Sequence, residues 1–242
     1  LTPKLQEKLK QNVIVDNKAG ATGTIGAGFV KRAPADGYTL LVTSLGPLVI
    51  APYLLAKVPY EASKDFDYLT VAVQAPNVLV VPASSPYKTM AELIAAEKAN
   101  PGKLTFASAG TGTSDHLSAE LFKTSTGTFV THIPYRGAAQ AVTGLMAGEV
   151  DMMFENLPSV LGQIQGGSVK ALAVTTRQRS KALPGVPTLI ESGLADFVVS
   201  AWYGVAAPAG TPAAVLARIE QALDKLARDP DIARAMESRG AE

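Results

Sequence analysis

A run of small and hydroxyl-bearing residues between a predicted strand and a predicted helix is the strongest candidate for chemistry. It covers residues 108–114 and reads Ser108-Ala109-Gly110-Thr111-Gly112-Thr113-Ser114. Such a run can offer free backbone N–H groups, flanking hydroxyls and the positive end of a helix dipole, and its small side chains let a ligand approach the backbone. These features favour binding of an anion such as a carboxylate over the alternative, a plain glycine-rich connector.

A carboxylate and an amide follow another predicted strand, at residues 150–154. Glu155 could accept a hydrogen bond from a ligand amine or hydroxyl, and Asn156 can both donate and accept. The carboxyl ends of strands are where ligands of open α/β sheets usually bind. The alternative role of Asn156 is to cap the next helix, and the two roles are compatible.

Two further segments carry aromatic or basic side chains. Tyr135 and Arg136 follow the predicted strand at 129–133, where the guanidinium could pair with a carboxylate or simply face solvent. The only tryptophan, Trp202, precedes Tyr203 in the segment 200–204. An aromatic face there could line a cleft or pack into the core, and the sequence favours neither.

Catalysis has weak support. Ser114, Asp115 and His116 have the residue types of a hydrolase triad, but adjacent helical residues point about 100° apart and cannot form a relay among themselves. The other histidine, His132, is interpreted as a polar residue within a strand. The chain has no cysteine and only these two histidines, without metal-ligand spacing. We therefore expect no catalytic residue, no metal site and no cofactor.

A glycine-rich turn near the start of the chain resembles a dinucleotide-binding loop only superficially. Gly20, Gly23 and Gly26 are spaced G-x-x-G-x-x-G, whereas the fingerprint is G-x-G-x-x-G. No acidic residue ends a following strand at the required distance, because Asp36 lies in a predicted turn. A loop that needs tight turns explains these glycines better.

The composition excludes several classes of protein. Of the 242 residues, 47% are hydrophobic and 18% are charged, with a net charge of +1. A disordered chain would be poorer in apolar residues, and a nucleic-acid binder would need a basic stripe. The longest apolar stretch, 47–56, is too short to span a membrane. Any signal peptide would lie outside this sequence.

Strands and helices alternate along the chain, which predicts parallel sheets covered by helices on both faces. The expected strands are 13–15, 38–42, 68–73, 78–81, 104–107, 129–133, 150–154, 169–174 and 202–206. The expected helices are 2–9, 24–32, 48–56, 89–100, 114–123, 138–147, 158–165, a long amphipathic helix from Thr211 and a last one from Asp229. Thr89 and Glu92 predict a capping box. The pattern is too long for one small sheet and predicts two α/β lobes.

Eight segments, taken in order, resemble the Bug family of extracytoplasmic solute receptors, which serve tripartite tricarboxylate transporters. They are V-I-V-D-N-K-A-G-A-T-G-T-I-G-A (13–27), A-D-G-Y-T-L-L (35–41), A-N-P-G-K-L-T-F-A-S-A-G-T-G-T-S-D-H-L (99–117), H-I-P-Y-R-G (132–137), G-E-V-D-M-M-F-E-N-L-P (148–158), K-A-L-A-V-T-T (170–176), L-P-G-V-P-T-L-I-E-S-G (183–193) and A-P-A-G-T-P (207–212). The resemblance covers nearly the whole chain.

The resemblance implies a two-lobed type II periplasmic-binding-protein fold of the α/β class, with the ligand in a cleft that closes on it. One lobe would comprise residues 1–82 and 202–242, and the other 83–201. Family members usually begin with a strand and a P-F-x-x-G-G loop and end with a further helix, so the chain looks truncated at both ends. The implied protein is a periplasmic monomer without enzymatic activity or a nucleic-acid partner.

The implied function is capture of a small carboxylate, a dicarboxylic, amino or aromatic acid, for delivery to membrane permease subunits. The expected ligand-binding residues are Ser44, Gly46, Ala109, Gly110, Thr111, Gly112, Thr113, Ser114, Tyr135, Glu155, Asn156 and Tyr203. Two alternatives stay open at this point. One is a carboxylester hydrolase or transferase that uses Ser114 and His116, and the other is the ligand-sensing domain of a transcription regulator.

Overall fold

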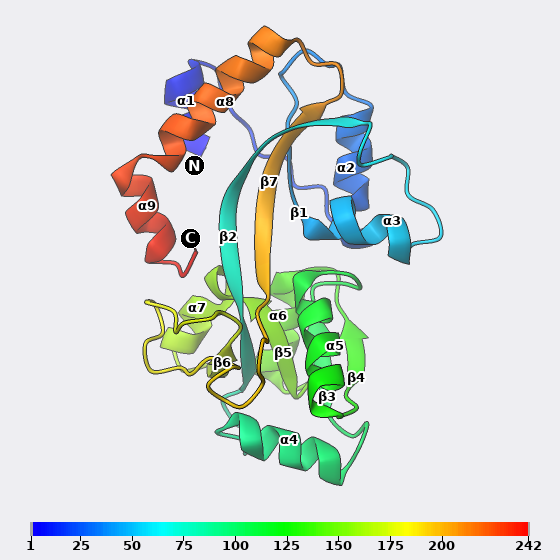
Figure 1. Ribbon diagram of the computed structural model, residues 1–242, viewed down its shortest axis with the longest axis vertical. Helices are drawn as coiled ribbons and strands as arrows, with labels where there is room; N and C mark the ends of the chain where they lie inside the picture. The colour runs from blue at the N-terminus through cyan, green and yellow to red at the C-terminus, as the bar shows by residue number, and fades with distance from the viewer. Residues whose placement is uncertain (1, 242) are drawn as a thin grey trace. The chain divides into compact units, whose positions relative to one another are not determined.

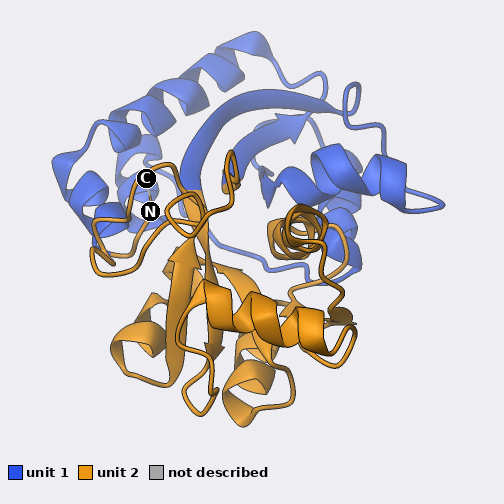
Figure 2. Ribbon diagram, turned by 60° about the horizontal axis from the view of Figure 1, so that its bottom comes forward, with its two compact units in different colours: residues 1–74, 202–238, 242 blue, residues 75–201, 239–241 orange. Residues whose placement is uncertain are grey.

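The computed structural model describes residues 2–241 and divides the chain into two compact units, coloured separately in Figure 2. Unit 1 comprises the chain up to Gln74 together with Trp202–Ser238, and unit 2 comprises Ala75–Ala201 with Arg239–Ala241. The expected first boundary, near residue 82, differs from the observed one. The division falls inside one continuous strand, β2 (Phe66–Pro82), where the sequence predicted two strands. Pro76 interrupts the pattern of the sequence, but its φ is compatible with an extended backbone.

Unit 1 is built on β1 (Leu41–Ser44), on β7 (Ser200–Pro208) from Trp202 onward and on the first half of β2, in the order β1-β7-β2. β1 and β7 pair antiparallel, with Leu41 opposite Ala206 and Ser44 opposite Tyr203. The other elements are α1 (Thr2–Leu9), η1 (Ala21–Gly23), α2 (Thr24–Lys31), η2 (Gly46–Ile50), α3 (Ala51–Leu54), α8 (Ala213–Ala227) and α9 (Pro230–Glu237). Figure 1 shows α1 beside α8, where Arg218 donates to the backbone oxygen of Leu9.

The predicted buried strand at 13–15 is wrong. These residues form no strand, and Ile14 and Val15 are 81% and 65% exposed. A β-branched run becomes a strand only when a neighbouring strand pairs with its backbone groups. Within residues 2–241, no strand pairs with this segment.

Unit 2 holds one mixed sheet of five strands. β5 (Met152–Asn156), β3 (Thr105–Ser108) and β4 (Thr131–Pro134) pair parallel, whereas the second half of β2 pairs antiparallel with β5 and with β6 (Val169–Val174). The prediction of wholly parallel sheets is therefore wrong for β2 and for the β1–β7 pair. Alternation of strands and helices does not tell which strands become neighbours, and β2 runs opposite to β5 and β6, the strands beside it in unit 2.

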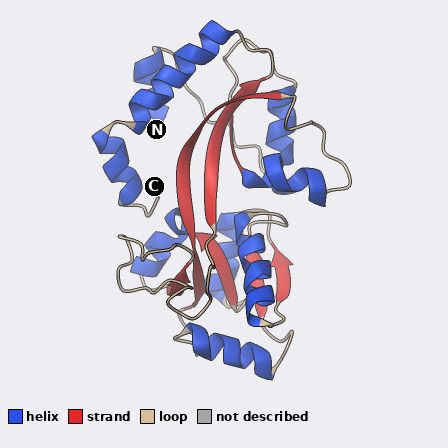
Figure 3. Ribbon diagram, in the orientation of Figure 1, coloured by secondary structure: helices blue, strands red, loops and turns tan. Residues whose placement is uncertain are grey.

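Helices cover both faces of this sheet (Figures 1 and 3). They are α4 (Met90–Ala99), α5 (Ser114–Thr126), α6 (Ala138–Ala147) and α7 (Leu157–Gln165). Alternate side chains of β5 enter two different cores: Phe154 packs with Leu93 of α4 and Phe122 of α5, whereas Met153 packs with Leu145 of α6 and Leu157 of α7. The predicted capping box at Thr89 and Glu92 is present at the start of α4.

Two predicted elements, the helix 138–147 and the strand 169–174, match the observed α6 and β6 at both ends. Among residues 2–241, every helix is too short or too polar to cross a lipid bilayer.

Candidate anion-binding site

The loop at 108–114 joins β3 to α5 and brings small residues to the first turn of that helix. Gly110 and Gly112 have φ values of 138° and 87°, which only glycine adopts without strain. The Thr113 side chain accepts from the His116 N–H at 3.5 Å and donates to the Gly110 carbonyl at 2.8 Å. The sequence thus folds this loop into a tight turn that ends in an N-cap at the positive end of the helix dipole.

The expectation that the backbone amides of this loop are free is wrong for four of them. Each donates a hydrogen bond to an acceptor in the same region. The pairs are Ala109 N to Asp115 Oδ2 (3.2 Å), Gly110 N to Ser108 Oγ (3.2 Å), Gly112 N to His116 Nδ1 (3.2 Å) and Thr113 N to Gly110 O (3.3 Å). The protein uses its own side chains to hold the loop, because a buried N–H group without a partner is costly.

Two carboxyl groups and an amide are buried where β5 ends, against the first turn of α5. The side-chain Nδ2 of Asn156 donates to Asp115 Oδ1 at 3.0 Å and to Glu155 Oε1 at 3.2 Å. Glu155 Oε1 also accepts from the Asn156 backbone N–H at 2.7 Å, and Ser114 Oγ donates to Asp115 Oδ1 at 3.2 Å. Asn156 occupies the N-cap position of α7, but its side chain makes no capping hydrogen bond. Its amide serves the carboxyl pair instead.

A second amide docks α5 on the sheet. Asn77 of β2 lies directly opposite Asn156 of β5 and donates through Nδ2 to Ser118 Oγ at 2.9 Å. Asp115 and Ser118 are three residues apart and therefore lie on one face of α5. The sequence reasoning missed Asn77, because a single asparagine within a strand carries no local signal of a buried partner.

Burial dominates the electrostatics of this cluster. It raises the pKa of both Asp115 and Glu155 above the usual range of a carboxyl group, and the negative charge of Asp115 raises the pKa of Glu155 further. Hydrogen bonds from the Ala109 N–H and the Ser114 hydroxyl oppose the rise at Asp115. The two groups cannot both be ionised at neutral pH without a large energetic cost.

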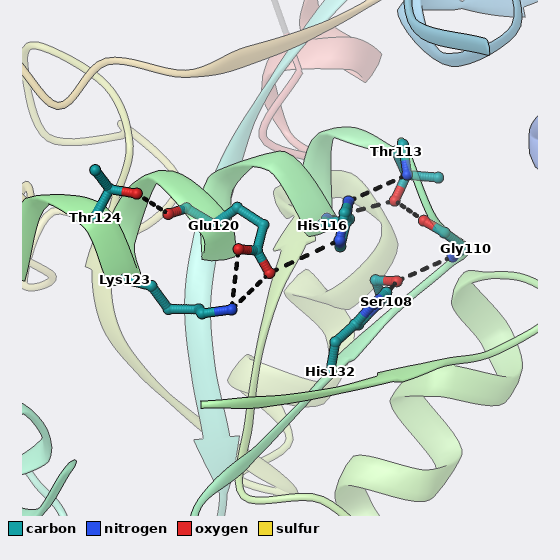
Figure 4. A network of polar contacts seen from close by, with 9 residues as sticks. Ser108, Gly110, Thr113, His116, Glu120, Lys123, Thr124 and His132 are labelled. Atoms are coloured by element: carbon teal, nitrogen blue, oxygen red, sulfur yellow. Dashed lines mark hydrogen bonds and ion pairs between the residues drawn. The ribbon is translucent and has the colours of Figure 1, made fainter. Parts of the chain in front are cut away.

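The two histidines lie together beside the loop (Figure 4). His132 of β4 lies 2.7 Å from Ser108 Oγ through Nε2, and its ring centroid is 4.3 Å from that of His116. His116 lies 3.8 Å from Glu120, which also pairs with Lys123 at 2.8 Å. β3 and β4 pair in parallel, so the end of β3 lies beside β4 and Ser108 comes within reach of His132. The sequence does not show that these two strands become neighbours.

This arrangement does not build a nucleophile. The Ser108 side chain is fully buried and its oxygen also accepts the Gly110 N–H, while the Ser114 hydroxyl donates to Asp115 and not to a histidine. In the described part of the chain, no three histidine, cysteine or acidic side chains are grouped so that they could hold a metal ion. These side chains anchor the loop, and their geometry does not suit acyl transfer.

His132 is expected to make the protein sensitive to acid. Burial and the neighbouring His116 lower the pKa of His132 from 6.5 to about 4. In the folded state His132 therefore binds a proton only at a lower pH than in the unfolded state. The protein loses stability as the pH falls from 6.5 to about 4. Discounted for the partial exposure of the ring, the loss is about 1 to 2 kcal/mol. Urea denaturation of wild type and His132→Asn should show this difference, and equal acid sensitivity of the two would contradict it.

The remaining predicted residues are placed as follows. In unit 1, Ser44 ends β1 opposite Tyr203 of β7, and Gly46 is buried at the start of η2. In unit 2, the Tyr135 hydroxyl donates to Glu149 at 3.0 Å. Trp202 packs against the core of unit 1, so the core alternative holds for the tryptophan.

Comparisons with known proteins identify the family. The whole chain, residues 1–242, matches the tripartite tricarboxylate transporter family receptor, TctC. A UPF0065 protein from the tcbD-tcbE intergenic region of Pseudomonas sp. strain P51 is 42% identical over 241 residues, which are 99% of this chain and 71% of that protein. Protein BugT of Bordetella pertussis is 37% identical over 238 residues, 98% of this chain and 73% of BugT.

Solved structures of similar proteins support the same family assignment. Rpa4515 of R. palustris with adipate matches with a TM-score of 0.97 at 32% identity, covering 100% of this chain and 81% of that one. MatC from Rhodopseudomonas palustris with bound malate matches with a TM-score of 0.92 at 31% identity, covering 99% of this chain and 82% of that one. The periplasmic binding protein BugD matches with a TM-score of 0.93 at 35% identity, covering 100% of this chain and 80% of that one. The chain therefore belongs to the TctC, or Bug, family of tripartite tricarboxylate transporter receptors, which are periplasmic solute-binding proteins of mixed α/β fold and not enzymes.

Proposed function

We propose that this chain captures a small carboxylate in the periplasm and presents it to the membrane permease subunits of a tripartite tricarboxylate transporter. The observation that carries the proposal is its structural match to relatives solved with adipate and with malate. Both ligands are small dicarboxylates. A dicarboxylic, amino or aromatic acid would present the same carboxylate group to a helix N-terminus.

The ligand loop of unit 2, defined as Ala109–Ser114, is the proposed carboxylate contact. Its internal hydrogen bonds fix the backbone in advance, so little conformational entropy is lost when a ligand binds. The dipole of α5 attracts a carboxylate placed at its first turn. In unit 1, Ser44, Gly46 and Tyr203 are the proposed contacts. Glu155 and Asn156 lie under the ligand loop, 0% and 7% exposed, and we infer that they support it from below.

Binding is tested first with a panel of acids. Adipate, malate, aspartate and nicotinate are added to the protein in a thermal-shift assay, with adipamide as the uncharged control. A ligand present at about 100 times its Kd adds about 2.7 kcal/mol to the free energy of unfolding. For a chain of this size, that raises Tm by roughly 5 to 10 °C. At least one acid should give this shift and adipamide should not. No shift with any acid would contradict the proposal.

A pair of glycine variants then locates the site. Gly112→Ala puts a side chain on a residue with φ of 87° inside the ligand loop. Gly127→Ala does the same at the other end of α5, where φ is 63° and no atom lies within 4 Å of the added carbon. Both variants should lose about 1 kcal/mol of stability from backbone strain. Only Gly112→Ala should weaken carboxylate binding, by tenfold or more. Equal affinity in the two variants would place the carboxylate elsewhere.

A further inference from the structure

The carboxyl groups of Asp115 and Glu155 converge on one donor group. Both accept from Nδ2 of Asn156, at 3.0 and 3.2 Å, and the exposed fractions of their residues are 1% and 0%. Glu155 Oε2 is buried without a hydrogen-bond partner. A carboxylate in this position would have one oxygen with no donor, whereas a protonated carboxyl group avoids burying that charge.

The distribution of donors decides which group keeps the proton. Asp115 accepts from a backbone N–H, a hydroxyl and the Asn156 amide, and it lies in the first turn of α5, where the helix dipole favours a negative charge. Among the described residues, the donors to Glu155 are the two N–H groups of Asn156. Asp115 is therefore the ionised member and Glu155 the protonated one. Burial and the charge of Asp115, which raise the pKa of Glu155, act in the same direction.

Within residues 2–241, no cationic side chain neutralises the Asp115–Glu155 pair. On α5 the charged or titratable groups after Asp115 are His116, Glu120 and Lys123, and these interact with one another. The adjoining β3, α6, α7 and the unit 2 part of β2 contain no titratable side chain. Tyr135 and Glu149 pair with each other, Asp151 accepts from Thr105, and Lys170 donates to the backbone of Ser85. Arg177, which follows β6, is exposed. Of the residues that the structure describes, none forms an ion pair with Asp115 or Glu155.

We propose that Asp115 and Glu155 together hold one proton, carried by Glu155 while Asn156 donates to both groups, and that this proton positions the ligand loop. With one proton, Asp115 keeps its bond to the Ala109 N–H and anchors the start of the loop. Loss of the proton puts two negative charges on one amide in a buried place, and the repulsion is relieved when Asp115 moves away and releases Ala109. Asp115 and Glu155 are thus positioning residues, and their link to ligand affinity rests on the proposed function.

The protonation of the two carboxyl groups is measured without ligand, on the full wild-type chain. The carboxyl carbons of Asp115 and Glu155 are followed by NMR from about pH 4 to about pH 10, with Asp115→Asn and Glu155→Gln used for assignment. We expect the Glu155 resonance to stay in its protonated position at neutral pH and to shift at alkaline pH, with the Ala109 amide shifting at the same midpoint. A Glu155 midpoint near that of an ordinary glutamate, about 4.3, would overturn the proposal.

Amide exchange tests the effect on the loop. Protection of the Ala109 N–H should fall at least tenfold between about pH 7 and about pH 10, after correction for intrinsic exchange. Glu155→Gln keeps a neutral acceptor in the same place and should abolish this fall. Glu97→Gln is the matched control, since Glu97 is also a fully buried glutamate of unit 2 but lies on α4. It should leave the fall unchanged. A wild-type response in Glu155→Gln would overturn the proposal.

Adipate serves as the probe that separates the proposal from the proposed function. If adipate binds to wild type, its affinity should fall with the loss of Ala109 protection, and it should stay constant in Glu155→Gln. Unchanged affinity in wild type would overturn the link between the proton and the loop. If adipate and the other acids fail to bind while the NMR titration is as expected, the shared proton stands and the carboxylate function falls.

Discussion

Asn156→Ala is expected to lower the free energy of unfolding by about 2 to 4 kcal/mol at neutral pH, because it removes the donor that two buried carboxyl groups share, one of which is ionised. The cost is electrostatic, so it should shrink in acid. Near pH 4 both carboxyl groups are protonated in the folded protein, and their ionisation in the unfolded chain is the same for wild type and variant, so only the ordinary loss of hydrogen bonds, about 1 to 2 kcal/mol, should remain. Urea denaturation at about pH 7 and about pH 4 measures both values.

Asn77→Ala is the matched control for this substitution. Asn77 is the same residue type, is fully buried, lies directly opposite Asn156 in the sheet and also donates to α5. Its partner is the Ser118 hydroxyl rather than a carboxyl group, so its loss should cost about 1 to 2 kcal/mol at both pH values. If the two variants lose the same stability at neutral pH, the carboxyl pair is not charged in the way that its geometry indicates.

Prediction from the sequence succeeded where the signal is local. The helix α6 and the strand β6 were predicted with their observed ends, and the capping box at Thr89 and Glu92 was found from two residues at the required spacing. Each of these features depends on a short run of residues, whose apolar or capping side chains recur at the spacing of a helix or of a strand. The family was also accessible, because eight ordered segments resemble it over nearly the whole chain.

Prediction failed where the outcome depends on which segments become neighbours. The run Val13-Ile14-Val15 has the composition of a strand, but in the described chain no other strand pairs with it. Likewise, the ligand loop was expected to expose its N–H groups, because a sequence does not show that Asp115 and His116 turn back to accept from Ala109 and Gly112. The partners of buried polar groups are set by tertiary structure, and these decide the chemistry of the site.

Glu97→Gln is expected to stabilise the protein at alkaline pH by about 2 to 3 kcal/mol. Glu97 of α4 is fully buried beside a hydrophobic core, and burial raises its pKa from 4.5 to about 7. The Thr128 hydroxyl opposes this rise, but it also bonds to Thr126 at 2.7 Å, and neither carboxyl oxygen of Glu97 has a partner of good geometry. The protein therefore buries a carboxyl group that must stay protonated or bear an unpaired charge.

The sign of the pH dependence follows from the raised pKa. Because the folded state holds the proton of Glu97 more tightly than the unfolded state, its stabilising effect is present below pH 4.5 and is lost as the pH rises to about 7. Glutamine is neutral at every pH, so the gain from Glu97→Gln should be near zero at about pH 4.5 and complete at about pH 8. Urea denaturation at both values measures it, with Glu220→Gln on the exposed face of α8 as the control. An equal gain at both pH values would assign the effect to packing rather than to the proton, and no gain at about pH 8 would mean that Glu97 ionises without cost.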